Sequence, residues 1–463
     1  MNSQPIPAGS GAPLETGPSR TSLFVTADGR NLAFTFILVS SLFLLWGFCN
    51  GMIDVMDKHF QEVLHLTLAQ SANVQWAHYL GYFLMALPAG WLATRLGYKS
   101  GIITGLLIVA AGGLWFIPAT HIASFWAFLV GVCCIAAGLT FLETVANPYT
   151  TVLGPTRYAA ARINLAQSCN GVGWIFGPVA GSMFFYAKDA AGRSTGSQTL
   201  WIPYAGVAVV VLILAVVFFF ADVPDIKTRD DYHLDDSTPG VSHSIWTHPH
   251  FVMAVAAQFF YVAAQAGIFA FFINYMTSQT PPIPESWNAF LRPGWLETGA
   301  DGTRHVSNAF ASILASGGFV CFLAGRFTGA ALLKTVSAHR MLAVYALLNV
   351  AVSVLIVCKL GWLSVGCVFL SYFFMSIMFP TIFGLGIFGL GARAKKASAF
   401  IVMAIMGGAL LPKLMGAIAD KYDVSRGFVV PAACFALVAL YGLSWPRLSN
   451  TEGVRGLKTA GAR

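Results

Sequence analysis

The chain has 463 residues, of which 57% are hydrophobic and 10% are charged, and its mean hydropathy is +0.69. This number of polar side chains is too small to cover a soluble globular protein of this size. The composition therefore excludes a soluble protein and predicts an all-α membrane protein. The formal net charge is +8. The basic residues lie in short segments between apolar runs, which is typical of topology signals and argues against nucleic acid as a partner.

Twelve apolar runs are long enough to cross a bilayer. Residues 1–31, which precede them, are rich in Pro, Gly and Ser and lack the order of a secretion signal, so we predict a disordered cytoplasmic tail. The first six runs form an N-terminal half over residues 32–221. They occupy roughly 32–56, 69–93, 100–118, 123–150, 163–187 and 202–221.

A charged segment, DVPDIKTRDDYHLDDSTPGVSHS, follows the sixth run and marks the strongest change of composition in the chain. We predict a cytoplasmic linker over residues 222–249. A C-terminal half over residues 250–446 and a cytoplasmic tail over 447–463 complete the chain. The runs of this half are roughly 250–276, 307–325, 338–358, 361–385, 397–419 and 428–446.

The distribution of Lys and Arg predicts the orientation. If the N-terminus is cytoplasmic, eighteen of the 27 basic residues fall on the cytoplasmic side and nine on the other. This bias places both termini and the linker inside, in a multi-pass protein of the inner membrane. Two halves of six spans are the plan of the major facilitator fold, in which the solute site lies near the midplane between the halves.

A carboxylate within the first run is the clearest functional signal. Asp54 lies in LLWGFCNGMIDVMDKHFQE, and ionising it in the bilayer costs about 2.5–3.5 kcal/mol on insertion scales. Glu143 is a second carboxylate in an apolar helix without a basic partner nearby in the sequence. Such costly groups are predicted to take up and release a proton, or to bind a solute, during a transport cycle.

Amide side chains recur at helical spacing and predict a water-lined cavity. Together with aromatic side chains they suit a sugar, whose hydroxyls need donors and acceptors and whose ring faces need apolar plates. The alternative is that each amide only ties helices together, at about 0.6 kcal/mol per contact. The candidates are Asn50 near Asp54, Asn147 near Glu143, Asn164, Gln167 and Asn170 in the fifth run, and Gln258, Tyr261 and Gln265 in the seventh.

Other polar residues near the runs are predicted to be peripheral. Asp57, Lys58, His59 and Glu62 are interpreted as a solvated end of the first helix. Lys413 is expected to extend towards the outer end of its helix rather than to couple a proton. The Pro- and Gly-rich loop 277–306 is expected to be passive, with a cap over the outer mouth as the alternative.

Five segments together resemble the fucose/galactose/glucose:proton symporter family of the major facilitator superfamily: WGFCNGMIDVMDKHFQ, LETVANPYTTVLGP, RINLAQSCNGVGWIFGP, FPTIFGLGIFGLG and MAIMGGALLPKLMGAIAD. The resemblance implies that the acidic residue of the first helix, here Asp54, couples the proton. It implies that Glu143 takes part in sugar binding and coupling, and that Gln167 and Asn170 line the sugar cavity.

We therefore expect proton-coupled uptake of a neutral monosaccharide such as L-fucose, galactose or glucose, by a carrier that is not an enzyme and needs no cofactor or metal. Asp54 and Glu143 are the predicted proton-coupling residues. The predicted sugar-binding residues are Asn50, Glu143, Asn147, Gln167, Asn170 and Gln265. An uncoupled facilitator and a proton-linked exporter stay open as alternatives, because a fold alone fixes neither direction nor coupling. A monomer in the lipid bilayer is sufficient for this mechanism.

Overall fold

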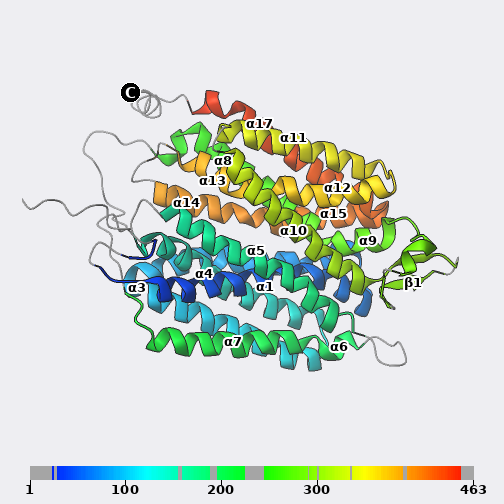
Figure 1. Ribbon diagram of the computed structural model, residues 1–463, viewed down its shortest axis with the longest axis horizontal. Coiled ribbons are helices and arrows are strands. Elements are labelled where there is room, and N and C mark those ends of the chain that lie inside the picture. Colours follow the sequence, from blue (N-terminus) through cyan, green and yellow to red (C-terminus); the bar gives the residue numbers. More distant parts are fainter. Residues whose placement is uncertain are drawn as a thin grey trace, which may run out of the picture.

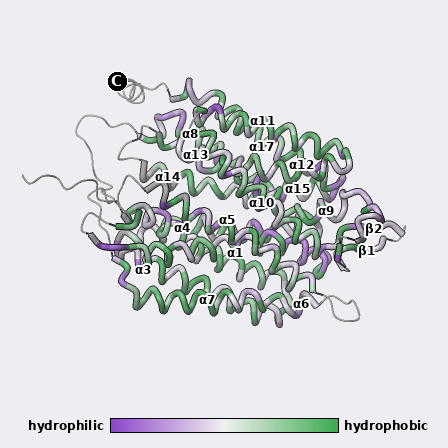
Figure 2. The backbone as a smooth tube through the Cα atoms, in the orientation of Figure 1, coloured by the Kyte–Doolittle hydropathy of each residue, from purple (hydrophilic) through white to green (hydrophobic). Residues whose placement is uncertain are grey.

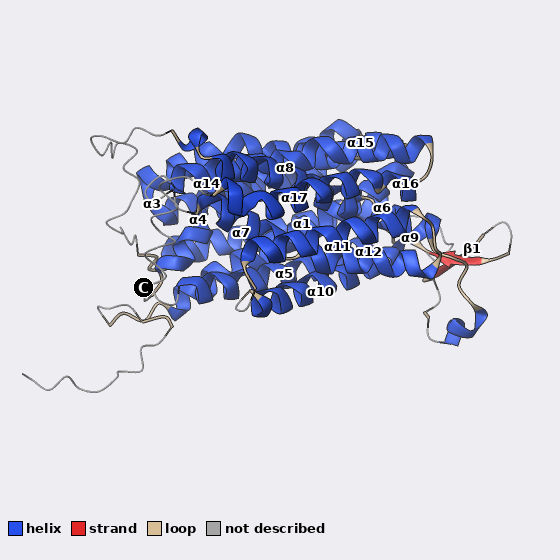
Figure 3. Cartoon of the chain, turned by 90° about the horizontal axis from the view of Figure 1, so that it is seen from above, coloured by secondary structure: helices blue, strands red, loops and turns tan. Residues whose placement is uncertain are grey.

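The computed structural model describes residues 23–25, 29–154, 159–187, 195–224, 244–289, 291–292, 294–299, 302–333, 336–388, 390 and 394–449. Long helices run side by side along the longest axis of the molecule (Figures 1 and 3). Most of the predicted linker and of both predicted tails lies outside the described residues. The structure therefore describes the two predicted helical halves and little of what connects or flanks them.

The N-terminal half contains seven described helices. They are α1 (Ala33–Val63), α2 (Leu68–Ser71), α3 (Asn73–Ile122), α4 (Phe125–Val152), α5 (Ala159–Phe184), α6 (Gly196–Thr199) and α7 (Trp201–Phe220). The long α3 covers the second and third predicted spans. It turns at Gly97, whose φ of 83° lies in the region that glycine adopts without steric cost.

The C-terminal half repeats this plan with more interruptions. Its α-helices are α8 (Pro249–Ala270), α9 (Phe272–Gln279), α10 (Asn308–Leu332), α11 (Ala338–Val357), α12 (Trp362–Met375), α13 (Met378–Ile387), α14 (Ala394–Met403), α15 (Gly407–Lys421), α16 (Val424–Gly427) and α17 (Val429–Leu448). Short 3₁₀ turns lie at Ile245–Thr247, Glu285–Ala289 and Ala404–Met406. Helix therefore occurs in all twelve predicted ranges.

Ten helical segments within the described residues are long and apolar enough to cross a membrane. The two predicted spans outside that set are 69–93 and 163–187, the first part of α3 and most of α5. Both carry rows of polar side chains, which lower their hydropathy. Hydrophobic residues predominate along the helices (Figure 2), and many large apolar side chains are exposed; Phe220 at the end of α7, for example, is 80% exposed. Such a surface suits lipid and not water.

The two ends of the bundle differ. One end holds the start of α1 and the end of α17, and we call it the terminal face (Figure 1). The other end, the hairpin face, carries a small antiparallel sheet of β1 (Leu296–Thr298) and β2 (Arg304–Val306). This hairpin, within loop 277–306, is the one sheet among the described residues and adds to the predicted all-α fold.

Close approach of α1 and α5 depends on glycine. A Cβ atom added at Gly177 of α5 would lie 2.5 Å from the carbonyl carbon of Gly51 on α1, which no real side chain tolerates. Gly47 and Gly173 meet the same two backbones elsewhere along the contact. Small residues that let two helix backbones touch are the usual packing device in membranes. This contact fixes how α1 presents its polar residues to the other helices.

Arg162, near the start of α5, is buried at the terminal face. Its guanidinium donates to the carbonyl oxygens of Thr150 (2.9 Å), Leu23 (3.1 Å) and Gly154 (3.2 Å). It ties the turn between α4 and α5 to the segment that precedes α1. Of the predicted disordered tail, the described residues around Leu23 thus contact the bundle.

Candidate functional site

A row of polar side chains joins α1 to the first part of α3. Trp46 Nε1 donates a hydrogen bond of 2.6 Å to the hydroxyl of Tyr82. Nearer the hairpin face, Nε2 of Gln75 donates to Oδ1 of Asp54 and to Oδ2 of Asp57, each at 3.3 Å. The α1 residues of this row are three or four positions apart or a multiple of that, so they share one side of the helix.

Burial of the two carboxyl groups is nearly complete. Asp54 is 7% exposed, Asp57 is 0% exposed, and Gln75 between them is 1% exposed. Oδ2 of Asp54 and Oδ1 of Asp57 have no hydrogen-bond partner among the described residues. Two buried acids that share a single amide form an unusual site, because buried charges normally have strong compensating partners.

The prediction that Asp57 and His59 belong to a solvated helix end is wrong. His59 is 3% exposed, and its ring packs against those of Phe185 and Tyr186 at the end of α5. The reason is that α1 continues seven residues beyond the predicted span and other chain segments cover it. The prediction holds for the other two residues of this set, Lys58 and Glu62, which form a partly exposed ion pair at 3.2 Å.

A second polar group lies on α4 and α5, around Glu143. The Glu143 side chain is half-buried, and its backbone carbonyl accepts a 3.1 Å hydrogen bond from Asn147 Nδ2. Asn147 Oδ1 in turn accepts a 3.0 Å hydrogen bond from Gln167 Nε2. The structure thus brings together Glu143, Asn147 and Gln167 from two different helices, whereas the Asn164 side chain lies outside what the structure describes.

The remaining predicted sugar-binding residues have different surroundings. Asn170 is buried and donates to the carbonyl oxygen of Phe43 on α1 at 3.3 Å, a contact of the helix-joining kind. Asn50 is buried beside Tyr82, and its Oδ1 has no partner among the described residues. On α8, Gln265 is half-buried, and the amide of the fully buried Gln258 has neither of its polar atoms paired. Unpaired amides inside a bundle are free to bind a polar solute.

Tyr79 of α3 links these groups. Asp54, Tyr261 of α8 and Glu143 all lie close enough to its hydroxyl to interact with it electrostatically. Its ring presses on α15, where any side chain at Gly408 would collide with it. Tyr79 therefore lies where Asp54, Glu143 and the C-terminal half approach one another.

Sequence reasoning missed Gln75, Tyr79 and Tyr82. A signal for them exists, since the three residues are spaced four and then three positions apart in the predicted span 69–93. Such spacing puts them on one side of a helix, as it does Asn50 and Asp54 on α1. What the spacing does not reveal is which other helix this side meets.

The two halves are joined at the hairpin face. Asp420, at the end of α15, accepts hydrogen bonds from the backbone N–H groups of Leu68 (2.7 Å) and Ala69 (2.9 Å) at the start of α2. Asn308 of α10 donates to both carboxylate oxygens of Glu62 at 2.7 Å. These contacts cross from one half to the other, above the buried carboxyl pair.

Further contacts extend this closure towards the midplane. Ser312 and Ser316 of α10 donate to the carbonyl oxygens of Pro178 (2.6 Å) and Ile175 (2.7 Å) on α5. Lys413 is exposed, and its Nζ lies 3.3 Å from Oδ1 of Asn73. Lys413 thus reaches the hairpin-face end of α3, in the direction that the sequence predicted. The molecule is in a conformation closed at the hairpin face.

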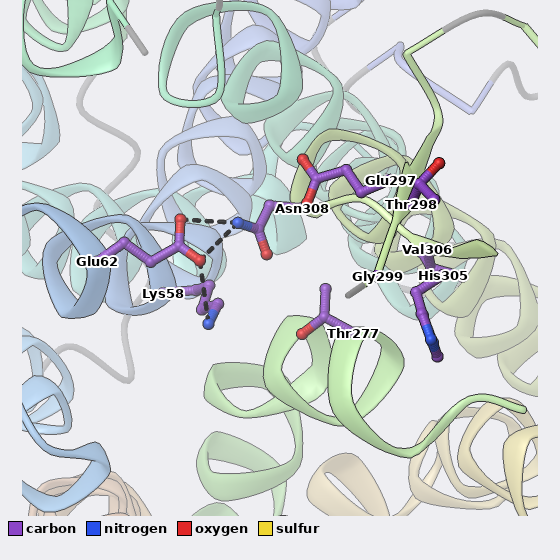
Figure 4. A pocket seen from close by; sticks show the side chains of 9 residues that line it. All are labelled: Lys58, Glu62, Thr277, Glu297, Thr298, Gly299, His305, Val306 and Asn308. Atoms are coloured by element: carbon purple, nitrogen blue, oxygen red, sulfur yellow. Dashed lines mark hydrogen bonds and ion pairs between the residues drawn. The ribbon is translucent and has the colours of Figure 1, made fainter. Parts of the chain in front are cut away.

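A polar pocket of about 230 Å³ opens at the hairpin face, between α1, α9, the hairpin and the start of α10 (Figure 4). Its lining consists of Lys58, Glu62, Thr277, Glu297, Thr298, Gly299, His305, Val306 and Asn308. None of the predicted sugar or proton residues is among them, so this pocket is separate from the carboxyl groups inside the bundle. Loop 277–306 thus forms part of its wall.

Residues 32–300 match the family model described as Major Facilitator Superfamily. The chain is 34% identical to the L-fucose-proton symporter of Escherichia coli over 89% of this chain and 93% of that protein. It is 32% identical to a glucose/galactose transporter of Brucella abortus over 90% of this chain and 95% of that one.

Solved structures agree on the fold. A crystal structure of the major facilitator transporter FucP in the outward conformation is 34% identical, with a TM-score of 0.65 over 90% of this chain and 99% of that chain. A D-xylose-proton symporter structure, at 12% identity, has a TM-score of 0.66 over 89% of this chain and 97% of that chain. At 12% identity, the second match shows the fold alone.

Proposed function

This chain belongs to the Major Facilitator Superfamily and, within it, to the fucose/galactose/glucose:proton symporter family, and from that premise we propose that it takes up a neutral monosaccharide together with a proton. L-fucose, galactose and glucose are the candidate sugars, since the relatives are named for them. The protein is a multi-pass membrane transporter and not an enzyme.

The observation that carries the proposal is the environment of Asp54. It is 7% exposed, and in the part of the chain that the structure describes its side chain pairs with no Lys or Arg. Ionisation of a carboxyl group there is costly in the conformation closed at the hairpin face, so burial favours its protonated form. If this carboxyl group were exposed first to one side of the membrane and then to the other, it would carry a proton across.

Sugar binding is assigned to the groups around Glu143. Asn147 and Gln167 each offer a donor and an acceptor to sugar hydroxyls, and Glu143 offers two acceptor oxygens. Asn50 and Asn170 would contribute from the same half, and Gln265 from α8 of the other half. Because Tyr79 lies near both carboxyl groups, occupancy of the sugar site can influence the state of Asp54 without direct contact.

The proposed cycle follows from the closed hairpin face. We take the hairpin face as the outer side, because the excess of Lys and Arg puts both termini in the cytoplasm. Opening of the hairpin face would admit a proton to Asp54 and a sugar to the Glu143 group. Closure through contacts such as Asp420 with α2 would then precede release inside. One copy of the chain contains every group that this cycle uses.

The decisive test uses purified protein in liposomes. Asp54→Asn is expected to abolish sugar accumulation driven by an acid outside, while exchange of labelled for unlabelled sugar continues, because exchange needs no net proton movement. Asn147→Ala is the complementary variant and should weaken sugar binding in both assays. Accumulation that survives in Asp54→Asn would reject the role of Asp54.

Two rival transport modes are separated in the same liposomes. A facilitator would equilibrate sugar without accumulation and would ignore an imposed acid pulse, whereas a symporter would accumulate sugar and make the outer solution more alkaline. An exporter would accumulate sugar only under the opposite gradient. A competition panel of unlabelled fucose, galactose, glucose, mannose and N-acetylglucosamine would identify the preferred sugar.

A further inference from the structure

A second carboxyl group, one helical turn from Asp54, has no role in the proposed cycle. We propose that Asp57 is a positioning residue for the transported proton: through the shared amide of Gln75 it forms a pair with Asp54 that holds one proton between the two acids. The inference rests on the proposed function, because it concerns the same proton site.

The geometry of the pair supports this assignment. Both bonded carboxylate oxygens lie 3.3 Å from the same nitrogen, Nε2 of Gln75, so they are at most twice that distance apart. Two negative charges so close inside a bundle repel each other strongly, and one of the two acids therefore retains a proton. The remaining charge of the pair raises the affinity of its partner for that proton.

The amide of Gln75 suits both states of such a pair. Its Nε2 is a donor for ionised oxygens, and its Oε1, which is buried and has no partner, is an acceptor for the O–H of a protonated acid. The unpaired oxygens, Oδ2 of Asp54 and Oδ1 of Asp57, are positions where the proton can reside. Rotation of the amide exchanges its donor and acceptor ends, so the site can follow a proton as it enters or leaves.

No positive charge competes with the proton in the described surroundings. On α1, Lys58 pairs with Glu62, and the ring of His59 packs against the end of α5. Asp57 interacts electrostatically with Asp54 and with three tyrosines from three segments: Tyr79 of α3, Tyr186 after α5 and Tyr204 of α7.

His78 of α3 also lies close by in sequence. It packs its ring against Tyr79 and Tyr82, and its Nδ1 is buried and unpaired. Its contacts are therefore with the tyrosines of α3, and no hydrogen bond joins it to the carboxyl pair among the described residues.

The test measures acid-driven sugar uptake into liposomes against external pH, beside sugar exchange, for the wild type and Asp57→Asn. At a separation of about 6 Å and an effective dielectric constant near 20, loss of the partner charge should move half-maximal uptake roughly one to two pH units towards acid. Exchange should continue, since it needs no net proton transfer. Asp57→Glu should restore the wild-type profile, because it restores the charge.

Glu285→Gln serves as the control, since it removes an exposed acid in loop 277–306, outside the pair, and should leave the pH profile unchanged. An unshifted profile for Asp57→Asn would overturn the inference, as would equal loss of uptake and exchange. A fall in the number of protons moved per sugar would also overturn it, because Asp57 would then carry a proton of its own. A wild type indifferent to acid would instead reject the proposed function itself.

Discussion

Asp420 provides the sharpest test of how the hairpin face closes. Its carboxylate accepts two backbone hydrogen bonds from α2, at 2.7 Å from Leu68 and 2.9 Å from Ala69, across the boundary between the halves. Asp420→Asn keeps one oxygen as an acceptor and loses the charge and the second bond. A hydrogen bond to a charged group contributes about 1.5–3 kcal/mol, and the low end applies to this exposed site. The closed conformation should lose about tenfold in population relative to the open one.

The population can be read from a distance across the hairpin face. Spin labels at His65 and Tyr422, both exposed and on opposite halves, would report it after replacement of the eight native cysteines. Asp420→Asn should shift the distance distribution towards longer values. Asp423→Asn is the matched control, because the bonds of Asp423 within the described residues go to Lys359 and Arg426, both of its own half. An unchanged distribution in Asp420→Asn, or an equal change in both variants, would refute the reasoning.

Two further predictions concern stability, measured by thermal unfolding in detergent. Gly177→Ala should lower the unfolding free energy by about 1–3 kcal/mol, because its methyl group would strike the backbone of α1, whereas Gly206→Ala, with no atom within 4 Å, should cost nothing. Partial burial raises the pKa of Asp423, but the hydrogen bond from Lys359, the backbone N–H of Arg426 and both positive charges outweigh it, so its pKa is lowered. Asp423→Asn should therefore destabilise the protein at pH 7 and lose this effect as the pH falls below about 4. If the difference in unfolding free energy between wild type and Asp423→Asn were the same at pH 7 and pH 3, the charge of Asp423 would not be its cause.

Much of the architecture was predictable because a bilayer imposes a length and an apolar composition on every span. Those two requirements are local, so twelve ranges could be read directly, and helix occurs in each. Asp54 and Glu143 were recognisable for the same reason, since a carboxylate in an apolar run is visible without knowledge of its neighbours. Asn147 and Gln167 meet in the structure, whereas the spacing of polar residues predicted only that each lies on the polar side of its own helix.

The surroundings of these residues depended on contacts between distant parts of the chain. In the sequence, Asp57 was predicted to lie at a solvated helix end because charged residues follow it. In the structure it is buried by segments that lie far away in the sequence. Gln75 belongs to the site only because α3 packs with one particular side against α1. Asp420 meets α2 across about 350 positions of sequence. Helical spacing specifies which side chains share a side of a helix, but packing alone selects the partner that this side meets.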